Sequence, residues 1–417
     1  MEKLIEFVAE HLNDDTARLI LDRARWPGID MSMAVSCIES RRKLKGKVQE
    51  WYDEPGLVFP AKLSAEQCSS SATARYKASL AAGIAGHPFR IADLTGGLGV
   101  DSWFFSQDAE EVLYNEMQKT LCEAARHNFS VMKAGNIRIS NHAVVPDGYA
   151  EDPDEASPTS ILSDFFPDIV YMDPARRGEG GKKVFLIEEC TPDVLKLKDE
   201  IFRISRHILL KLSPMADITM VCNRLGRTCR EVHVVASGGE CKELLMWMDR
   251  EWDDEYTVHA VELVTEGDAA VFSFTPSEEK DSAARTGKIN PHGTSYLFEP
   301  GKALMKAGAF NLISTRFGIN KVGRSTHYYI IEDHSKAMEL KKYGKVFRIL
   351  QSLPLDKRSI KAAGKEYPKA EVTARNIPMD TDALRKRLGV SSGDLIHIFG
   401  IRSDSEGNLL IVTQKAL

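Results

Sequence analysis

Three glycines after a short apolar segment have a spacing that suits the binding of a small ligand. Residues 90–102 read R-I-A-D-L-T-G-G-L-G-V-D-S. Glycine permits sharp turns and lets a ligand lie against the backbone, and a helix start adds unpaired N–H donors. The stretch therefore predicts a strand, a glycine loop and the first turn of a helix that together hold something small. The candidate contacts are Asp93, Thr95, Gly96, Gly97 and Gly99.

Two acidic side chains end later apolar segments. E-V-L-Y-N-E ends on Glu116, about twenty residues past the glycines, where an acid holds ribose hydroxyls in dinucleotide-type folds. D-I-V-Y-M-D-P-A-R-R, at residues 168–177, contains Asp173 and Pro174 at the end of a second apolar run. The glycine pattern G-G-x-G is not the G-x-G-x-x-G of a dinucleotide site, and no pyrophosphate-binding feature accompanies it. The pattern therefore argues against a dinucleotide site.

Taken together, the Asp93 loop, Glu116 and Asp173-Pro174 resemble motifs one, two and four of the class I S-adenosylmethionine-dependent methyltransferases. The resemblance implies S-adenosylmethionine as the cofactor, with the glycine loop at its methionine end and Glu116 at its ribose. A strand at 137–143, I-R-I-S-N-H-A, would end beside the adenine. Many family members carry an acid there, whereas this chain has Asn141 and His142.

On the substrate side, Asp173-Pro174 stands where amino-methyltransferases carry Asn/Asp-Pro-Pro-aromatic, a motif whose oxygens accept hydrogen bonds from the target amine. Ala175 and Arg176 replace the proline and the aromatic residue. An arginine can stack on a base or hold a phosphate. Similar Asp-Pro-Pro-Arg sequences occur in carbon-methylating RNA enzymes, which need a cysteine nucleophile. The chain has no Pro-Cys pair, and Cys190 is interpreted as a buried helix residue. A nitrogen target is favoured, with Asp173, Pro174 and Arg176 as catalytic residues.

The elements that would position these residues form a doubly wound α/β fold. Strands and helices alternate through the centre of the chain, which is typical of a parallel sheet with helices on both faces. The resemblance implies a Rossmann-like, seven-stranded methyltransferase sheet over residues 81–280. Its terminal antiparallel pair is predicted at Y-T-V-H-A-V-E-L (256–263) and A-A-V-F-S-F (269–274).

An N-terminal region, residues 1–80, is predicted to be helical because apolar side chains recur at three and four residue intervals. Its basic run R-R-K-L-K-G-K, at 41–47, has two interpretations, a phosphate contact or a solvated helix face, and the second is favoured. The hydroxyl-rich stretch at 66–78 could contact the cofactor carboxylate, but Ser and Thr also begin helices, and the helix cap is favoured.

A third region, residues 290–417, alternates helical and strand patterns and is predicted to be an α+β domain, with a short helix at T-D-A-L-R-K-R-L-G, residues 381–389, and a hairpin formed by L-I-H-I-F-G and L-L-I-V-T. Its strand with R-N-I-P followed by L-R-K-R-L resembles the THUMP-like domain found behind some bacterial methyltransferase domains, which implies an RNA substrate such as tRNA or rRNA.

The charge of the chain is unevenly distributed. Residues 281–417 contain 23 Lys and Arg against 13 Asp and Glu, a net charge of +10. Because the whole chain has a net charge of −5, residues 1–280 carry −15. Such asymmetry suggests nucleic acid. The candidate RNA contacts are Arg375, Arg385, Lys386 and Arg387.

Composition bounds the remaining possibilities. The 417 residues are 43% hydrophobic and contain neither a signal-like N-terminal run nor a long apolar stretch, so a cytoplasmic protein is expected. Seven cysteines form no C-x-x-C pair and no zinc-like cluster, so we expect reduced thiols and no metal. Two alternatives stay open: methylation of a small molecule or a protein, and an RNA-binding protein whose methyltransferase fold has lost catalysis.

Overall fold

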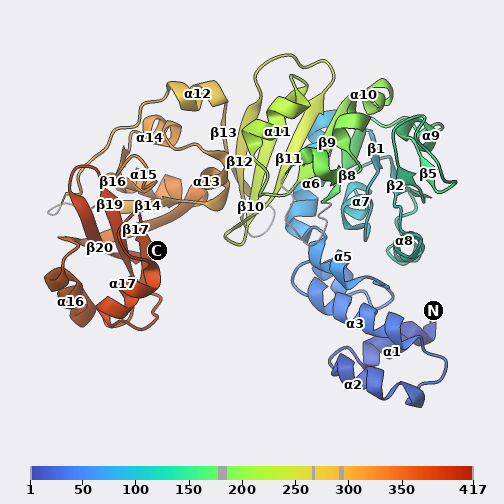
Figure 1. Cartoon of the computed structure of the whole chain (residues 1–417), viewed down its shortest axis with the longest axis horizontal. Helices are drawn as coiled ribbons and strands as arrows, with labels where there is room; N and C mark the ends of the chain where they lie inside the picture. Colours follow the sequence, from blue (N-terminus) through green and yellow to red (C-terminus); the bar gives the residue numbers. More distant parts are fainter. Residues whose placement is uncertain (1, 177–185, 265–267, 291–294, 416–417) are drawn as a thin grey trace. The chain divides into compact units, whose positions relative to one another are not determined.

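The computed structural model describes residues 2–176, 186–264, 268–290 and 295–415 (Figure 1). They form two compact units. The first comprises residues 2–237 and 242–256, and the second comprises residues 238–241, 257–264 and 268–415. Within these described residues, no helix is long and apolar enough to cross a membrane. The division into 1–80, 81–280 and 290–417 stays a prediction.

The sheet of the first unit is mostly parallel. Seven of the nine strands of this sheet belong to the first unit, in the order β10-β11-β9-β6-β1-β2-β3. β1 pairs in parallel with β2 and β6, β2 with β3, and β6 with β9, whereas β11 runs antiparallel to β9. The strands are β1 (Arg90–Asp93), β2 (Glu111–Asn115), β3 (Ile137–Ser140), β6 (Ile169–Met172), β9 (His207–Leu212), β10 (Cys229–Ser237) and β11 (Glu240–Asp249). These are seven strands, and they confirm the predicted doubly wound α/β class.

The terminal antiparallel pair predicted from the sequence is present. It is the hairpin β12 (Thr257–Leu263) and β13 (Ala269–Phe274), two strands of the same nine-stranded sheet whose residues fall in the second compact unit. The preceding strands β10 and β11 are joined by Gly238 and Gly239, which both have positive φ, as a tight hairpin turn requires.

The N-terminal helices build a core of their own, with Phe7, Leu19 and Ile38 among its buried members. Asp15 caps α2 by accepting from the Ala17 N–H. The helices of this region are α1 (Glu2–Glu10), α2 (Thr16–Leu21), α3 (Met31–Leu44), α4 (Gln49–Tyr52), α5 (Lys62–Gln67) and α6 (Ser71–Ala85). Those that follow are α7 (Val100–Phe105), α8 (Lys119–Val131), α9 (Pro158–Ile161), α10 (Val194–Ile204) and α11 (Ile218–Leu225).

The basic run at 41–47 is not a solvated face throughout. Arg41 is 4% exposed, and its guanidinium donates to the carbonyls of four residues between Tyr52 and Leu57. Lys47 Nζ donates to the carbonyls of Ala65 and Glu66 at the end of α5. These cations satisfy backbone carbonyls in the chain itself, which the local sequence pattern gave no means of predicting.

The second unit is an α+β structure around a second sheet, in the order β15-β16-β14-β17-β20-β19-β18. The predicted hairpin is present as β19 and β20, which pair antiparallel. The predicted short helix is α17, whose Leu384 and Leu388 are buried and whose Gly389 adopts the left-handed conformation that ends a helix. The strands are β14 (Tyr296–Pro300), β15 (Asn320–Lys321), β16 (Tyr329–Ile331), β17 (Gly344–Pro354), β18 (Glu371–Arg375), β19 (Ile396–Ser403) and β20 (Gly407–Lys415). The helices are α12 (Pro276–Asp281), α13 (Lys302–Ala307), α14 (Leu312–Phe317), α15 (His334–Leu340), α16 (Lys357–Glu366) and α17 (Thr381–Leu388).

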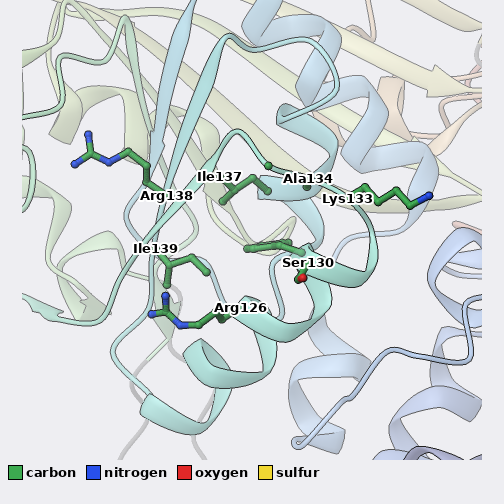
Figure 2. Close-up of a pocket in the computed structure, with 9 residues that line it drawn as sticks. Arg126, Ser130, Lys133, Ala134, Ile137, Arg138 and Ile139 are labelled. Atoms are coloured by element: carbon green, nitrogen blue, oxygen red, sulfur yellow. The ribbon is translucent and has the colours of Figure 1, made fainter. Parts of the chain in front are cut away.

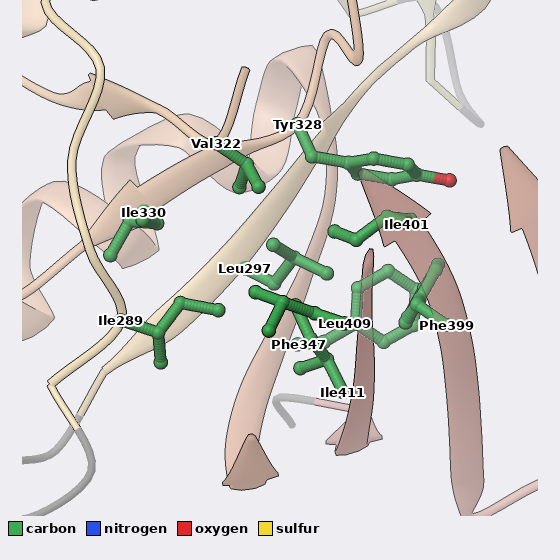
Figure 3. Packing of buried hydrophobic residues seen from close by; sticks show 10 residues of the cluster. All are labelled: Ile289, Leu297, Val322, Tyr328, Ile330, Phe347, Phe399, Ile401, Leu409 and Ile411. Atoms are coloured by element: carbon green, nitrogen blue, oxygen red, sulfur yellow. The ribbon is translucent and has the colours of Figure 1, made fainter. Parts of the chain in front are cut away.

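Strands β19 and β20 bury side chains on both faces of this sheet. Phe399 and Ile401 of β19 face one apolar cluster with Leu409 and Ile411 of β20 (Figure 3). The intervening Ile398, Leu410 and Val412 join a second cluster on the other face, with residues of α16 and α17. Successive strand residues point to opposite faces, so this continuous apolar sequence fills two cores at once.

Candidate active site

The glycine loop connects β1 to α7, and its three glycines have different reasons to be glycine. A Cβ on Gly96 would lie 2.1 Å from the Tyr114 ring, and one on Gly99 would lie 2.6 Å from the Phe129 ring. Gly97 has φ of +55°, and a Cβ there would meet nothing nearer than a backbone oxygen at 4.0 Å. Gly96 and Gly99 therefore allow the loop to pack closely, while the backbone at Gly97 lies open to a ligand.

Asp93, the last residue of β1, accepts hydrogen bonds from the glycine loop and from α7. It is 1% exposed; Oδ1 accepts from the Thr95 N–H at 3.0 Å and Oδ2 from the Ser102 hydroxyl at 2.6 Å. Burial raises the pKa of Asp93 to about 7, against the opposing effect of these hydrogen bonds. Ser102 was not predicted as a site residue, because a serine in the first turn of a helix carries no distinctive signal.

Glu116 follows β2 and reaches the loop. Its Oε2 accepts from the Gly97 N–H at 2.9 Å, and its Oε1 accepts from the Gln118 N–H at 2.7 Å. Burial raises the pKa of Glu116, which is 7% exposed. A carboxylate oxygen has two lone-pair sites, so each oxygen keeps one for a further donor such as a ribose hydroxyl. The structure thus brings together Glu116 and Gly97, as the motif resemblance implied.

Asn141 and His142, predicted at the adenine side, also lie beside Glu116. The Asn141 side chain donates to the Glu116 carbonyl at 2.6 Å. The His142 N–H donates to the side-chain oxygen of Asn115 at 3.1 Å, and the His142 ring contacts the Ser140 hydroxyl at 2.9 Å. The amide nitrogen of Asn141 is therefore occupied by backbone, which leaves its carbonyl oxygen for an external donor.

Asp173 lies at the end of β6, next to the glycine loop. Its N–H donates to Thr95 Oγ1 at 2.6 Å, so the loop and this motif are directly bonded. Its Oδ2 accepts from Lys211 Nζ at 2.5 Å, and the Asp173 side chain is 38% exposed. Among the described residues, no group donates to Asp173 Oδ1. Pro174 is buried.

Lys211, on β9, was missed by the sequence analysis. Its side chain is only 11% exposed. Burial on its own would lower the pKa of Lys211, but nearby carboxylates, above all Asp173, raise it overall. The only signal was a lysine inside the apolar segment H-I-L-L-K-L, and a single such residue predicts no partner.

Arg176, predicted to be catalytic, is placed here only by its backbone. β7 (Ala175–Arg176) pairs antiparallel with β8 (Cys190–Thr191). The side chain of Arg176 lies outside the described residues. Cys190 is buried as predicted, but it lies in a strand and not in a helix.

A buried ionic cluster includes Asp101, on the helix that follows the glycine loop. Lys77, on α6, is fully buried, and its Nζ lies 2.8 and 3.0 Å from the Glu243 oxygens of β11 and 3.3 Å from Asp101 Oδ1 of α7. Asp101 also accepts from Tyr171 and Ser69 at 2.8 and 2.9 Å. This cluster ties the N-terminal helix to the sheet and to the helix after the glycine loop.

The helix-cap interpretation of the hydroxyl-rich stretch at 66–78 is confirmed. Ser70 is the N-cap of α6 and forms a capping box with Thr73. Ser69 is 6% exposed and serves the ionic cluster. These hydroxyls therefore begin a helix and satisfy buried charges.

The four residues predicted to contact RNA differ in exposure and in whether they already have a partner within the chain. Arg375 lies 4.5 Å over the Tyr328 ring and 3.5 Å from Glu299. Arg385 lies 3.3 Å from Glu371. Lys386 and Arg387 are exposed on α17.

A separate hollow of about 660 Å³ is lined by residues of α8, of β3 and of the turn between them (Figure 2). Arg126, Lys133 and Arg138 contribute cations to its lining. It contains none of the predicted site residues, and Arg138 is already bound to Asp164. We therefore treat this hollow as distinct from the site around the glycine loop.

Known proteins resemble this chain along its length. Residues 344–415 match the family described as THUMP domain-like, and residues 296–337 match a ferredoxin-like domain. The chain is 24% identical over 377 residues to an uncharacterized S-adenosylmethionine-dependent methyltransferase of Mycobacterium tuberculosis (strain ATCC 25618 / H37Rv), with 88% of this chain and 89% of that protein covered. A crystal structure of a candidate methyltransferase from Porphyromonas gingivalis W83 is 27% identical, with a TM-score of 0.83 over 100% of this chain and 98% of that chain.

These similarities agree with the site geometry. The chain is a homologue of S-adenosylmethionine-dependent methyltransferases, its first unit has a mixed α/β fold with a large, mostly parallel sheet, and a THUMP-like domain lies at its C-terminus. The open backbone at Gly97 and the available lone pairs of Glu116 fit a ribose-containing cofactor.

Proposed function

We propose that the protein is an S-adenosylmethionine-dependent methyltransferase that methylates a nitrogen of an RNA base, in tRNA or rRNA. The observation that carries this proposal is the Asp173 carboxylate. It lies at the carboxyl end of β6, beside the glycine loop. Its Oδ2 accepts a hydrogen bond from Lys211, and its Oδ1 would be available to a substrate.

The loop geometry supports the cofactor contacts. The backbone of Gly97 and the neighbouring Thr95 would face the methionine end, Glu116 would accept hydrogen bonds from the ribose, and Asn141 would lie towards the adenine. When bound, S-adenosylmethionine supplies a methyl group already activated by the sulfonium charge. The protein then has to hold the nucleophile in line and exclude water.

On the target side, Asp173 Oδ1 would accept a hydrogen bond from an amine N–H, and the carbonyl of Pro174 would accept a second. These two bonds leave the nitrogen lone pair directed at the methyl group. Carbon methylation would need a cysteine nucleophile, and Cys190 is buried, with its thiol against the Leu186 carbonyl. A nitrogen target is therefore the better match.

RNA as the substrate is supported by the THUMP-like match and by the charge distribution. Lys386 and Arg387 are exposed and offer phosphate contacts, whereas Arg375 and Arg385 would have to share their carboxylate partners with RNA. Phosphate contacts make affinity fall steeply with ionic strength, and a small neutral substrate would not show this dependence.

The test is transfer of radiolabelled methyl from S-adenosylmethionine to RNA that lacks its natural modifications, by wild type and by Asp173→Ala. We expect transfer by wild type, a product methylated on nitrogen by mass spectrometry, and no transfer by the variant. The matched control is Asp164→Ala, an exposed carboxylate bound to Arg138 away from the loop. Cofactor binding without transfer to any RNA would favour a small-molecule or protein substrate, and RNA binding without cofactor binding would favour an inactive binding protein.

A further inference from the structure

We propose that Lys211 is a positioning residue that fixes Asp173 as a purely hydrogen-bond-accepting group, which restricts the substrate to a target atom that carries hydrogen. This inference rests on the proposed function and adds a specificity determinant to it. Four features support it: the strand register, the burial of the ammonium group, the surrounding charges and the hydrogen bonds of Asp173.

The strand register places the two residues side by side. β6 and β9 are parallel neighbours, and Met172 is opposite Leu210 in their ladder. Asp173 and Lys211 are the next residues along each strand, so their backbones are held at adjacent positions by the sheet. A rigid sheet holds functional groups more accurately than a loop does.

The Lys211 ammonium has few other options. Among the described residues, Asp173 Oδ2 is the hydrogen-bond acceptor of its Nζ, at 2.5 Å. The side chain is 11% exposed, so water offers little compensation for losing this partner. A buried ammonium without a hydrogen-bonded anion is unfavourable, which favours the Lys211–Asp173 pair over separated side chains.

The surrounding charges are consistent with a permanent cation at this position. Asp101 and Glu243 lie near Lys211, and Lys77 bonds to both of them. The charged and titratable groups that face Lys211 are Asp173 from β6, Asp101 from α7, Glu243 from β11, and Lys47 and Cys68 from the N-terminal helices. Three carboxylates, those of Asp173, Asp101 and Glu243, are paired with only two lysines, Lys77 and Lys211. The excess of negative charge stabilises the positive charge on Lys211.

The bonds of Asp173 then define what a substrate can offer. Its Oδ2 is taken by Lys211 and its N–H by Thr95, and this leaves Oδ1. An ionised carboxylate only accepts hydrogen bonds. The target must therefore donate, as an amine N–H does, and a carbonyl oxygen presented to this site would meet a negative charge without a proton between them.

The experiment compares Lys211→Met with wild type for cofactor affinity, for kcat and for KM of the RNA acceptor, using the full chain. We expect an unchanged affinity for S-adenosylmethionine, a loss in kcat on the order of 100-fold, which a misplacement of about 1 Å can cause, and a smaller change in KM. Lys211→Arg keeps the cation and should restore part of the loss. The control is Lys198→Met, a lysine of the same unit that donates to one carbonyl on α11 and should not alter kcat.

A double-mutant comparison separates positioning from general structural support. If Lys211 acts through Asp173, adding Lys211→Met to Asp173→Asn should change kcat by less than about threefold. Equal losses in both backgrounds, or near-normal kcat in Lys211→Met, would overturn the proposal. Lys211→Gln, which keeps a polar end, is the replacement if the methionine variant does not fold. Failure of wild type to bind cofactor or transfer methyl would instead refute the proposed function before any lysine variant is compared.

Discussion

Lys77→Met should be among the most damaging substitutions in the first unit. Lys77 is fully buried and Glu243 is 2% exposed, with 2.8 and 3.0 Å from Nζ to the two carboxylate oxygens. Removing one partner of a buried ion pair leaves an uncompensated charge, at a cost of about 3–5 kcal/mol. Asp101 loses the same cation, so we expect the upper part of that range.

The loss should depend on pH because Glu243 can take up a proton. Burial raises the pKa of Glu243, and Lys77 opposes that shift. Without Lys77, the pKa of Glu243 rises further, so near pH 5 the carboxyl is increasingly protonated and its burial costs less. The free energy lost in Lys77→Met should therefore be larger at pH 8 than at pH 5.

Urea unfolding monitored by tryptophan fluorescence measures this loss. With a denaturant slope of about 1–3 kcal/mol/M, we expect the midpoint at pH 8 to fall by more than about 1 M. The double variant Lys77→Met, Glu243→Gln should recover part of the loss, because no charge is then left opposite the removed cation. The control is Lys62→Met. The Lys62 side chain is 48% exposed, so solvent screens its ion pair with Glu39 and its loss should matter far less than the loss of the buried pair. Equal midpoints for Lys77→Met and Lys62→Met would refute the reasoning.

Three further predictions concern the loop and the RNA surface. Gly96→Ala should destabilise the protein by about 1–3 kcal/mol in urea unfolding, because its Cβ would lie 2.1 Å from the Tyr114 ring; a stable variant would contradict the loop packing. The pKa of Asp93 in the folded protein is about 7. Between about pH 4 and 7 the folded protein therefore keeps the Asp93 carboxyl protonated, whereas the unfolded chain releases that proton. The free energy of unfolding should thus fall as pH rises through this window, and Asp93→Asn should flatten that slope, by about 4 kcal/mol at most. Replacing Lys386 and Arg387 with alanine should reduce the salt dependence of RNA affinity, by about 0.7–0.9 in the log–log slope for each phosphate that the protein no longer neutralises, and an unchanged slope would place the RNA elsewhere.

The parts predicted correctly from sequence are those encoded by contiguous residues. β1, β2 and β6 are short apolar runs that each end near an acid, and α17 has two leucines on one face before Gly389. Such patterns reflect local periodicity and backbone preference, which a single sequence contains.

The parts that were missed depend on contacts between distant residues. β11 begins E-C-K-E and then becomes continuously apolar, so it shows no alternation, and it lies between β9 and β10 out of chain order. Lys211 and Asp173 are 38 residues apart, and Lys77 and Glu243 are 166 apart. A charged residue in an apolar segment signals an unusual position, but its partner appears only when the strands are assembled.

The central claim is tested most directly by calorimetric titration of the protein with S-adenosylmethionine and S-adenosylhomocysteine, beside Glu116→Ala. The control is Glu111→Ala, at the opposite end of β2 and bound to arginine side chains. We predict micromolar-range binding by wild type and by the control, and a loss of at least about tenfold, or 1.4 kcal/mol, in Glu116→Ala. Absence of binding by folded wild-type protein would contradict the assignment of a methyltransferase site.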